Sequence, residues 1–296
     1  SKLIDSIVVA VPEDNENQVL YDHVKTLGFH CHQGSENDVL SRFYCASKAH
    51  NADVIVRITG DCPLIDPTLV DQVIDGYVSS NADYFSNVAP PTFPDGLDVE
   101  VFSSKALELA HIEAKTDSDR EHVTPYLRTS GKFILGCLTH EEDLSNLRWT
   151  LDETEDLDLI KKVYGYFSPN KHFSWLEVLD YQRSDPNVFE VNQSISRNEG
   201  VNMSSGQKLY KRAKKVIPGG NMLLSKRPEM FLPDLWPSYY SKAKGCRVWD
   251  LDGREYIDMS VMGVGTNILG YSNEEVDQAV VEAVLNGNMS TLNCPE

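Results

Sequence analysis

The sequence predicts an α/β protein of two units, and three observations carry that prediction. Short β-branched runs alternate with segments of helical periodicity through the first 167 residues, as in a sheet covered by helices. Residues 1–200 hold 16 Lys and Arg against 34 Asp and Glu, whereas residues 201–296 hold 11 of each. Residues 182–205 are polar, with few apolar side chains. We therefore expect a large unit over 1–181, a linker over 182–205 and a small α+β unit over 206–296.

The first half of the large unit has the pattern of alternating strands and helices. The apolar run at 53–59 is the best strand in the chain, and Pro67 suits the first turn of the helix after it. In chain order the pattern predicts strand 4–11, helix 18–24 with a stop at Gly28, strand 29–32, helix 38–49, strand 53–59 and helix 67–77. This order favours a mainly parallel sheet between layers of helices.

The later elements are less regular. The large unit continues with predicted strand 97–102, helices 103–114 and 120–129, strands 134–138 and 147–151, and helix 155–167. The small unit is predicted as helix 206–216, a hairpin around the turn at 251–253, and helix 274–285. About 90 residues of this kind bury little core by themselves, so we expect the small unit to be cut off at its C-terminal end.

Composition excludes several classes of protein. The net charge of −18 disfavours nucleic-acid binding, which depends on neutralising phosphates, and suits divalent cations better. No apolar run is long enough to cross a bilayer, and the N-terminus carries no signal-peptide pattern. The six cysteines form no CxxC pair, so we expect neither a disulfide framework nor a zinc site, and we expect a cytoplasmic protein.

The segment 57–67 carries the first candidate for chemistry. A strand delivers Asp61 to its carboxyl end, where open α/β sheets bind ligands. Gly60 permits close approach of a ligand, and Pro63 turns the chain away. A carboxylate there can hold Mg²⁺ against a triphosphate, although an aspartate that caps a helix or a turn has the same local pattern. We interpret the adjacent Cys62 as a small packing residue.

A second acidic strand end lies at 147–157. Asp152 follows an apolar strand and precedes a helix, and capping of that helix by Thr154 and the neighbouring acids explains the pattern without any catalysis. Two aspartates at strand ends could nevertheless converge on one metal ion.

Two further clusters, 93–101 and 119–126, stand out. Asp98 and Glu100 are spaced to share one face of a strand, and Arg120 lies in the second cluster. A solvated sheet edge explains each cluster equally well.

Five ordered segments carry a family resemblance. Residues 34–40, 57–67, 94–101, 120–125 and 148–152 together resemble the spore-coat polysaccharide cytidylyltransferases, which are relatives of the sialic-acid and KDO cytidylyltransferases. The resemblance covers roughly the first 167 residues and implies a glycosyltransferase-A-like nucleotide-binding sheet flanked by helices. The implied reaction is attack of a sugar hydroxyl on the α-phosphate of CTP, which gives a CMP-sugar and pyrophosphate with Mg²⁺ neutralising the developing charge.

The resemblance also implies residue roles. Asp61 matches the aspartate that binds metal and nucleotide, Asp152 matches the second metal aspartate, and Asp98, Glu100 and Arg120 would line the sugar side. One departure matters, because the family opens with a strand and a loop rich in Gly, Arg and Lys that cradles the triphosphate. This chain has no such loop, and its first strand looks like the family's second. We therefore expect an N-terminally truncated sheet and no turnover by the chain as given.

The small unit resembles the start of a class III aminotransferase, with glutamate-1-semialdehyde aminomutase as the nearest type. The resemblance covers about 204–296 and is carried by residues 216–220, 244–253, 256–259 and 269–271. It implies the N-terminal piece of a fold-type I enzyme, packed on a large cofactor domain in a homodimer. Arg227 either matches an arginine that binds a substrate carboxylate or is a surface residue. In the family the Schiff-base lysine lies further downstream, so we expect pyridoxal phosphate only in the full-length aminotransferase.

Three hypotheses follow for the whole protein. The first is a bifunctional enzyme of surface-polysaccharide biosynthesis, seen here as a fragment that is inactive alone. The second is an aminotransferase or aminomutase dependent on pyridoxal phosphate that carries a non-catalytic nucleotide-binding-like domain. The third is an assembly error that joined two neighbouring genes. The presence of both Asp61 and Asp152 favours the first, and binding of CTP with Mg²⁺ separates it from the second.

Overall fold

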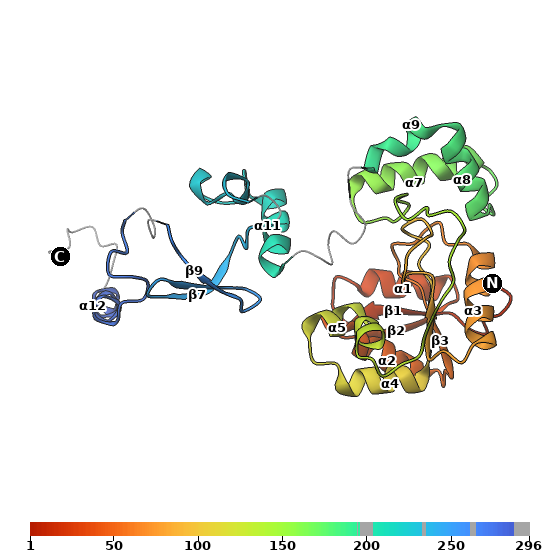
Figure 1. Cartoon of the computed structure of the whole chain (residues 1–296), viewed down its shortest axis with the longest axis horizontal. Helices are drawn as coiled ribbons and strands as arrows, with labels where there is room; N and C mark the ends of the chain where they lie inside the picture. Colours follow the sequence, from red (N-terminus) through yellow and green to blue (C-terminus); the bar gives the residue numbers. More distant parts are fainter. Residues whose placement is uncertain (194, 196–203, 233–234, 261–264, 287–296) are drawn as a thin grey trace. The chain divides into compact units, whose positions relative to one another are not determined.

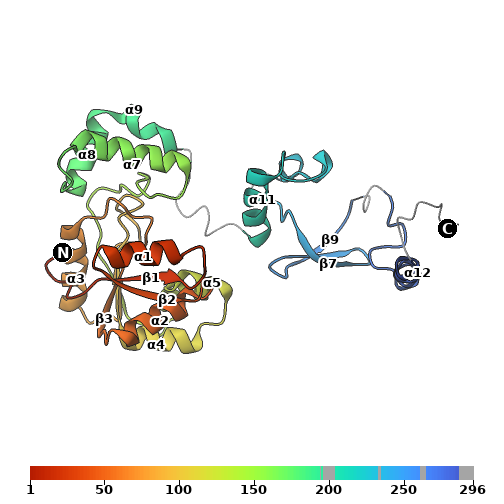
Figure 2. The same cartoon turned by 180° about the vertical axis from the view of Figure 1, so that it is seen from behind.

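The computed structural model describes residues 1–193, 195, 204–232, 235–260 and 265–286. The chain divides into two compact units, residues 1–197 (unit 1) and 198–296 (unit 2), shown in Figures 1 and 2. Unit 1 is a mixed α/β structure, which confirms the predicted fold class. Its elements are β1 (Val8–Pro12), α1 (Gln18–Thr26), β2 (His30–Gly34), α2 (Val39–Ala49), β3 (Val54–Arg57), α3 (Pro67–Ser79), β4 (Tyr84–Ser86), β5 (Glu100–Ser103), α4 (Ser104–Glu113), α5 (Asp117–His122), α6 (Pro125–Thr129), β6 (Leu135–Cys137), α7 (Thr154–Phe167), α8 (Trp175–Ser184), α9 (Pro186–Phe189) and η1 (Glu190–Asn192).

The strands of unit 1 form two sheets. β1 pairs with β2 in parallel, with Val8 opposite His30. The second sheet has the order β3-β5-β4-β6, in which β4 and β6 are parallel but β5 runs antiparallel to both β3 and β4. The expectation of a mainly parallel sheet was therefore wrong for β5. The reason is that residues 87–99 return the chain from β4 without a crossover helix, and only antiparallel neighbours can be joined in that way.

Side-chain alternation along β4 and β5 builds a core on each face of the second sheet. Tyr84 and Phe102 point to one face and pack with Leu40 of α2 and Leu107 of α4. Phe85 of β4 points to the other face, where α3 covers it. Figure 1 shows this arrangement, with α3 on one side of the strands and α2 and α4 on the other. Each face is thus sealed by a helix, as expected for an α/β layer structure.

A third cluster joins the C-terminal helices of unit 1 to its loops. Trp149, Leu159, Trp175 and Phe189 are buried together. The predicted linker began at 182, but α8 ends at Ser184 and helical structure continues through η1. The difference arises because apolar side chains inside this polar stretch reach the core, and Phe189 is only 1% exposed.

One buried carboxylate connects two helices of unit 1. Asp66 is the N-cap of α3, and its Oδ1 accepts from the amide of Thr68 at 2.6 Å. Its Oδ2 accepts from the amide of Trp175, the first residue of α8, at 2.8 Å. Both α3 and α8 therefore begin at the same side chain, which satisfies an amide in the first turn of each.

Two other predicted elements differ from the structure. The single helix expected over 120–129 is divided into α5 and α6 at Val123, which has φ of 71°, and α6 starts at Pro125. A positive φ and a proline are both incompatible with a continuous helix. The strand expected over 147–151 is reduced to an isolated bridge between Arg148 and Asp95.

Unit 2 contains fewer buried side chains. Its elements are α11 (Ser205–Val216), η2 (Leu224–Lys226), η3 (Pro228–Met230), β7 (Tyr240–Lys244), β8 (Arg247–Asp250), β9 (Glu255–Ile257) and α12 (Glu274–Leu285). β7, β8 and β9 form an antiparallel sheet in chain order. Asp250 is 2% exposed and accepts hydrogen bonds from the amide of Arg254 and the hydroxyl of Tyr256, which fixes the turn between β8 and β9. α12 buries none of its side chains.

None of the helices in the described part of the chain has the combination of length and hydrophobicity that a membrane span needs.

Candidate active site

Two acidic segments meet at one edge of the second sheet. β3 and β5 are antiparallel, with Arg57, the last residue of β3, opposite Glu100, the first residue of β5. Asp61 follows the last residue of β3, and Asp98 precedes the first residue of β5. Both therefore lie beyond the same end of this strand pair. Both carboxylates interact electrostatically with the Cys62 side chain. The pairing of the two strands therefore gathers acids that are 37 positions apart in the sequence.

A third acidic segment is joined to the first by backbone hydrogen bonds. The carbonyl oxygen of Asp61 accepts from the amide of Leu151 at 2.8 Å and from the Thr150 hydroxyl at 3.1 Å. Asp152 is the next residue. The structure thus brings together the two aspartates that the sequence singled out as metal ligands.

A glycine permits this close approach. Gly96 has φ of +101°, and a Cβ built on it would lie 2.5 Å from the amide nitrogen of Thr150. Leu147 and Trp149 form backbone hydrogen bonds with Asp95 at 2.8 and 2.7 Å. The segment that carries Asp98 therefore lies directly against the segment that carries Asp152.

The charge of Asp61 affects the ionisation of Asp152. The pKa of Asp152 is raised, first by partial burial and then by the negative charge of Asp61, and Arg148 offsets these effects only in part. Two carboxylates that repel each other bind a divalent cation favourably, because the cation removes that repulsion.

The thiol of Cys62 lies 3.7 Å from Asp61 Oδ1. Its side chain is 6% exposed, and burial raises the pKa of its thiol to about 12. The thiol therefore remains protonated at neutral pH, in agreement with the interpretation of Cys62 as a packing residue.

Arg148 connects Asp152 to the interior. Its Nη2 lies 3.3 Å from Asp152 Oδ2 and 2.7 Å from Asp156 Oδ2, and its Nε donates to Asp156 Oδ1 at 2.9 Å. Asp156 is fully buried. Burial opposes its ionisation, but the hydrogen bonds from Arg148 and other donors outweigh that effect and lower its pKa to about 2. The ion pair of Arg148 with Asp156 is therefore charged. It holds Arg148 Nη2 beside the carboxylate of Asp152, the candidate metal ligand.

In the sequence Arg148 belongs to the segment 148–152, and Asp156 is one of the acids predicted to cap the following helix. In the structure Glu153 is the N-cap of α7, Asp156 completes its capping box, and Thr154 is the first helical residue. The sequence feature that could have predicted a buried ion pair is a single arginine within the apolar run 147–151. Arginine is rarely buried without a charged partner.

Glu100 lies in the interior and not beside the acid pair. It is 4% exposed, forms an ion pair with Arg57, and accepts from the hydroxyl of Tyr84 at 2.6 Å. Burial opposes its ionisation, but Arg57 and the hydroxyls of Thr124 and Tyr84 lower its pKa below the ordinary value. β5 begins at Glu100, so Asp98 precedes the strand instead of sharing one of its faces.

The two arginines predicted from the sequence lie in other parts of the fold. Arg120 of α5 forms an ion pair with Asp38, the N-cap of α2, and donates to the carbonyl of His111 at 2.7 Å. Arg227 belongs to unit 2, where its guanidinium packs on Gly219 so closely that a Cβ there would lie 1.9 Å from Nη2. Within the part of unit 1 that the structure describes, Arg120 has no hydrogen bond or ion pair with Asp61 or Asp152.

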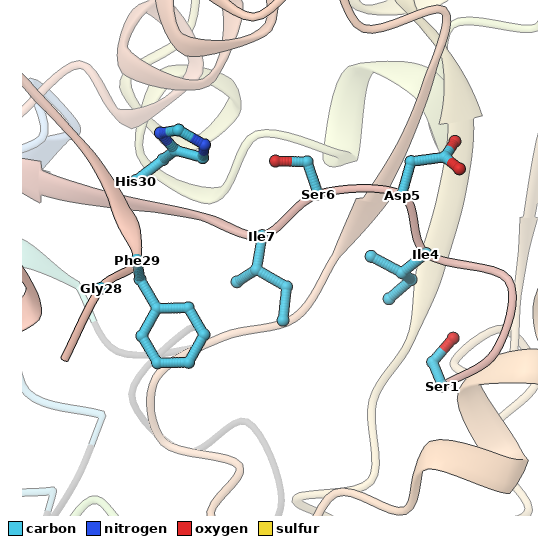
Figure 3. Close-up of a pocket in the computed structure, with 8 residues that line it drawn as sticks. All are labelled: Ser1, Ile4, Asp5, Ser6, Ile7, Gly28, Phe29 and His30. Atoms are coloured by element: carbon cyan, nitrogen blue, oxygen red, sulfur yellow. The ribbon is translucent and has the colours of Figure 1, made fainter.

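A separate pocket of about 320 Å³ lies at the beginning of the first sheet. In Figure 3 Ile7 and Phe29 extend to the same side of adjacent chain segments, and His30 turns to the opposite side. The lining residues are Ser1, Ile4, Asp5, Ser6, Ile7, Gly28, Phe29 and His30, and none of them is one of the predicted site residues.

The donor set of Asp61 and Asp152 fits magnesium. Within the described ranges no three His, Cys, Asp or Glu side chains are placed to hold a metal ion by themselves. Asp61 and Asp152 provide two carboxylates, and Mg²⁺ commonly takes one or two carboxylates and completes its shell with water and substrate phosphates. Zinc and other ions that require a closed protein shell fit these residues less well.

Comparison with known proteins agrees with the architecture. A family described as cytidylyltransferase matches residues 1–164. The spore coat polysaccharide biosynthesis protein SpsF of Bacillus subtilis is 30% identical over 188 residues, which is 62% of this chain and 77% of that protein. The structure of a cytidylyltransferase from Leptospira borgpetersenii superposes with a TM-score of 0.59 at 32% identity and covers 62% of this chain and 78% of the other.

A further match covers another 29% of the chain. Glutamate-1-semialdehyde 2,1-aminomutase of Methanococcoides burtonii is 36% identical over 87 residues, which span only 19% of that enzyme. The chain therefore belongs to the cytidylyltransferase family and joins its cytidylyltransferase part to an aminotransferase-like segment.

Proposed function

We propose that unit 1 is the cytidylyltransferase part of an enzyme that activates a sugar with CTP and releases a CMP-sugar and pyrophosphate, and that the chain as given does not turn over by itself. The observation that carries the proposal is the pairing of Asp61 and Asp152 through the 2.8 Å hydrogen bond between the Asp61 carbonyl and the Leu151 amide. This bond keeps the two mutually repelling carboxylates on adjacent segments of the chain, where they can bind a cation that carries a triphosphate.

The residues of the chain act by binding and orientation. Asp61 and Asp152 would hold Mg²⁺, which when bound neutralises charge on the phosphates of CTP. The hydroxyl oxygen of the sugar attacks the α-phosphorus, and the bond from that phosphorus to the β-phosphate oxygen breaks. Pyrophosphate leaves with the electron pair, and the hydroxyl proton passes to solvent or a nearby base. Asp98, at the same edge of the sheet, is the candidate for contact with the sugar.

Binding of CTP measured by calorimetry on the full chain, with and without Mg²⁺, tests this function without knowledge of the sugar. We expect binding that requires Mg²⁺ and favours CTP over ATP and UTP. Asp61→Asn and Asp152→Asn should each weaken binding by about tenfold or more, because each removes a metal ligand.

Asp158→Asn is the matched control, since its carboxylate is 57% exposed on α7 and forms only a weak pair with Lys161 at 4.0 Å. This variant should bind as the wild type does. Absence of CTP binding in the wild-type chain, or equal effects of all three variants, would contradict the proposed function.

For the whole protein we propose a bifunctional enzyme of surface-polysaccharide biosynthesis. The support is the name of the SpsF relative together with the aminomutase match in unit 2. The proposal includes pyridoxal phosphate and a homodimer for the complete aminotransferase part. Purification of the protein from its source, followed by intact mass and assays with CTP and with pyridoxal phosphate, tests it. A native protein with only one of the two activities would overturn it.

A further inference from the structure

A buried asparagine from the end of unit 1 completes the ion pair behind the acid pair. Asn192 of η1 is 1% exposed. Its Nδ2 donates to Asp156 Oδ1 at 2.8 Å and to the carbonyl oxygen of Arg148 at 3.2 Å. Asn192 lies beyond residues 1–164, which match the cytidylyltransferase family, so this contact is made by helices that follow the matched region.

Asp156 in turn fixes the backbone that carries Asp152. Its Oδ2 accepts from the main-chain amides of Asp152 at 3.0 Å and Glu153 at 2.9 Å. The same oxygen accepts from Arg148 Nη2, the nitrogen that also faces Asp152 Oδ2. The Asp152 carboxylate is therefore held from two sides, through its own backbone and through the guanidinium.

We propose that Asn192 is a positioning residue for Asp152. By holding Asp156 Oδ1 and the Arg148 carbonyl, it keeps the buried ion pair in a geometry that directs most of the Arg148 charge to Asp156. Without Asn192 the guanidinium is freer to turn to Asp152, where it competes with a cation for the same carboxylate oxygen. This inference rests on the proposed function, because it assigns a role to Asn192 at the same site.

A neighbouring hydrogen bond provides a control that distinguishes a positioning role of Asn192 from a contribution to packing alone. Gln182 of α8 is also buried, and its Oε1 accepts from Trp149 Nε1 at 2.8 Å. Gln182 and Asn192 both attach the C-terminal helices to residues 148–149, but only Asn192 contacts the carboxylate network. Gln182→Ala is thus a matched control for the stability lost when one such attachment is removed.

The experiment measures Mn²⁺ binding by electron paramagnetic resonance in the presence of CTP on the full chain. Wild type, Asn192→Ala, Gln182→Ala and Asp152→Asn are compared at a temperature at which circular dichroism shows all four to be folded. Groups that orient metal ligands typically change metal affinity by 10–100-fold, and we expect Asn192→Ala to weaken Mn²⁺ binding by about tenfold. Gln182→Ala should remain within about twofold of wild type.

Equal affinities in Asn192→Ala and Gln182→Ala would overturn the positioning role. If Asn192→Ala does not fold, Asn192→Ser, which keeps a hydroxyl donor and leaves a smaller cavity, serves in its place and should give an intermediate affinity. Wild-type affinity in the serine variant would overturn the proposal. Failure of the proposed function gives a different result, since wild type and Asp152→Asn would then bind Mn²⁺ equally.

Discussion

The main-chain amide of Leu151 donates to the carbonyl oxygen of Asp61 at 2.8 Å. This bond joins the segment after β3 to the segment before α7, and each of these segments carries one aspartate of the candidate site. Because the bond involves only backbone atoms, replacement of either carboxylate leaves the two segments attached. Charge effects between Asp61 and Asp152 can therefore be measured without loss of the local geometry.

Asp61→Asn should lower the pKa of Asp152. Partial burial and the charge of Asp61 both raise that pKa, and the substitution removes the second cause. A pH titration of the Asp152 carboxyl carbon by NMR measures the change. Asp158→Asn is the control and should leave the pKa of Asp152 unchanged. An unchanged pKa in Asp61→Asn would show that the two carboxylates do not interact.

Asp156→Asn should lower stability at neutral pH and remove part of the acid sensitivity of the fold. The pKa of Asp156 is about 2 in the folded state and about 3.9 in an unfolded chain. Its ionised form thus contributes stability above about pH 4, on the order of 2 kcal/mol, and the contribution is lost as the pH falls from about 4 to about 2. Urea unfolding of both proteins at pH 7 and at pH 2.5 checks this. The difference in unfolding free energy should shrink at the lower pH, and a constant difference would contradict the assignment.

Glu100→Gln should cost about 3 kcal/mol of unfolding free energy, because it leaves the Arg57 guanidinium without its charged partner in a largely buried place. Thermal or urea unfolding measures the loss. Replacing both residues by apolar ones of similar size should recover much of it. Glu142→Gln is the control, since its pair with Arg183 is more than half exposed on both sides and should contribute less than about 1 kcal/mol. Equal losses in the two single variants would contradict the structural role of Glu100.

Gly96→Ala should be more destabilising than Gly131→Ala. Both glycines have positive φ, +101° and +71°, but a Cβ at Gly96 meets the backbone of Trp149 and Thr150, whereas one at Gly131 meets nothing within 4 Å. Gly131→Ala should therefore lower the free energy of unfolding by about 1 kcal/mol, through backbone strain alone. In Gly96→Ala the steric clash should lower it by roughly 2 kcal/mol or more in addition. Chemical denaturation of both variants decides the order, and equal losses would show that the two segments are not in contact.

Local patterns in the sequence predicted much of the fold. α2 begins after Asp38 and α3 at Pro67, and α12 has the expected bounds, because capping residues, proline and apolar periodicity act over a few positions. β4 was not predicted, since three residues carry too little periodicity. The antiparallel direction of β5 depends on the course of residues 87–99, which no local pattern encodes.

The candidate site was predictable only in part. Asp61 and Asp152 could be found because each ends an apolar segment before a helix. The burial of Glu100 was not predictable, because Tyr84, Thr124 and Arg57 enclose it only after the strands pair. Asn192 gave no signal, since its partners Arg148 and Asp156 lie 44 and 36 positions earlier in the chain.

The shared origin of α3 and α8 has a consequence for how unit 1 opens. Asp66 accepts from Thr68 and from Trp175 at the same time, although these helices begin more than 100 residues apart. A fluctuation that detaches α8 removes one of the two hydrogen bonds that hold the Asp66 carboxylate, so opening at one helix start weakens the cap at the other. Both should exchange their first amide hydrogens at a common rate, as parts of one cooperative unit of unfolding that ties the C-terminal helices to the central sheet.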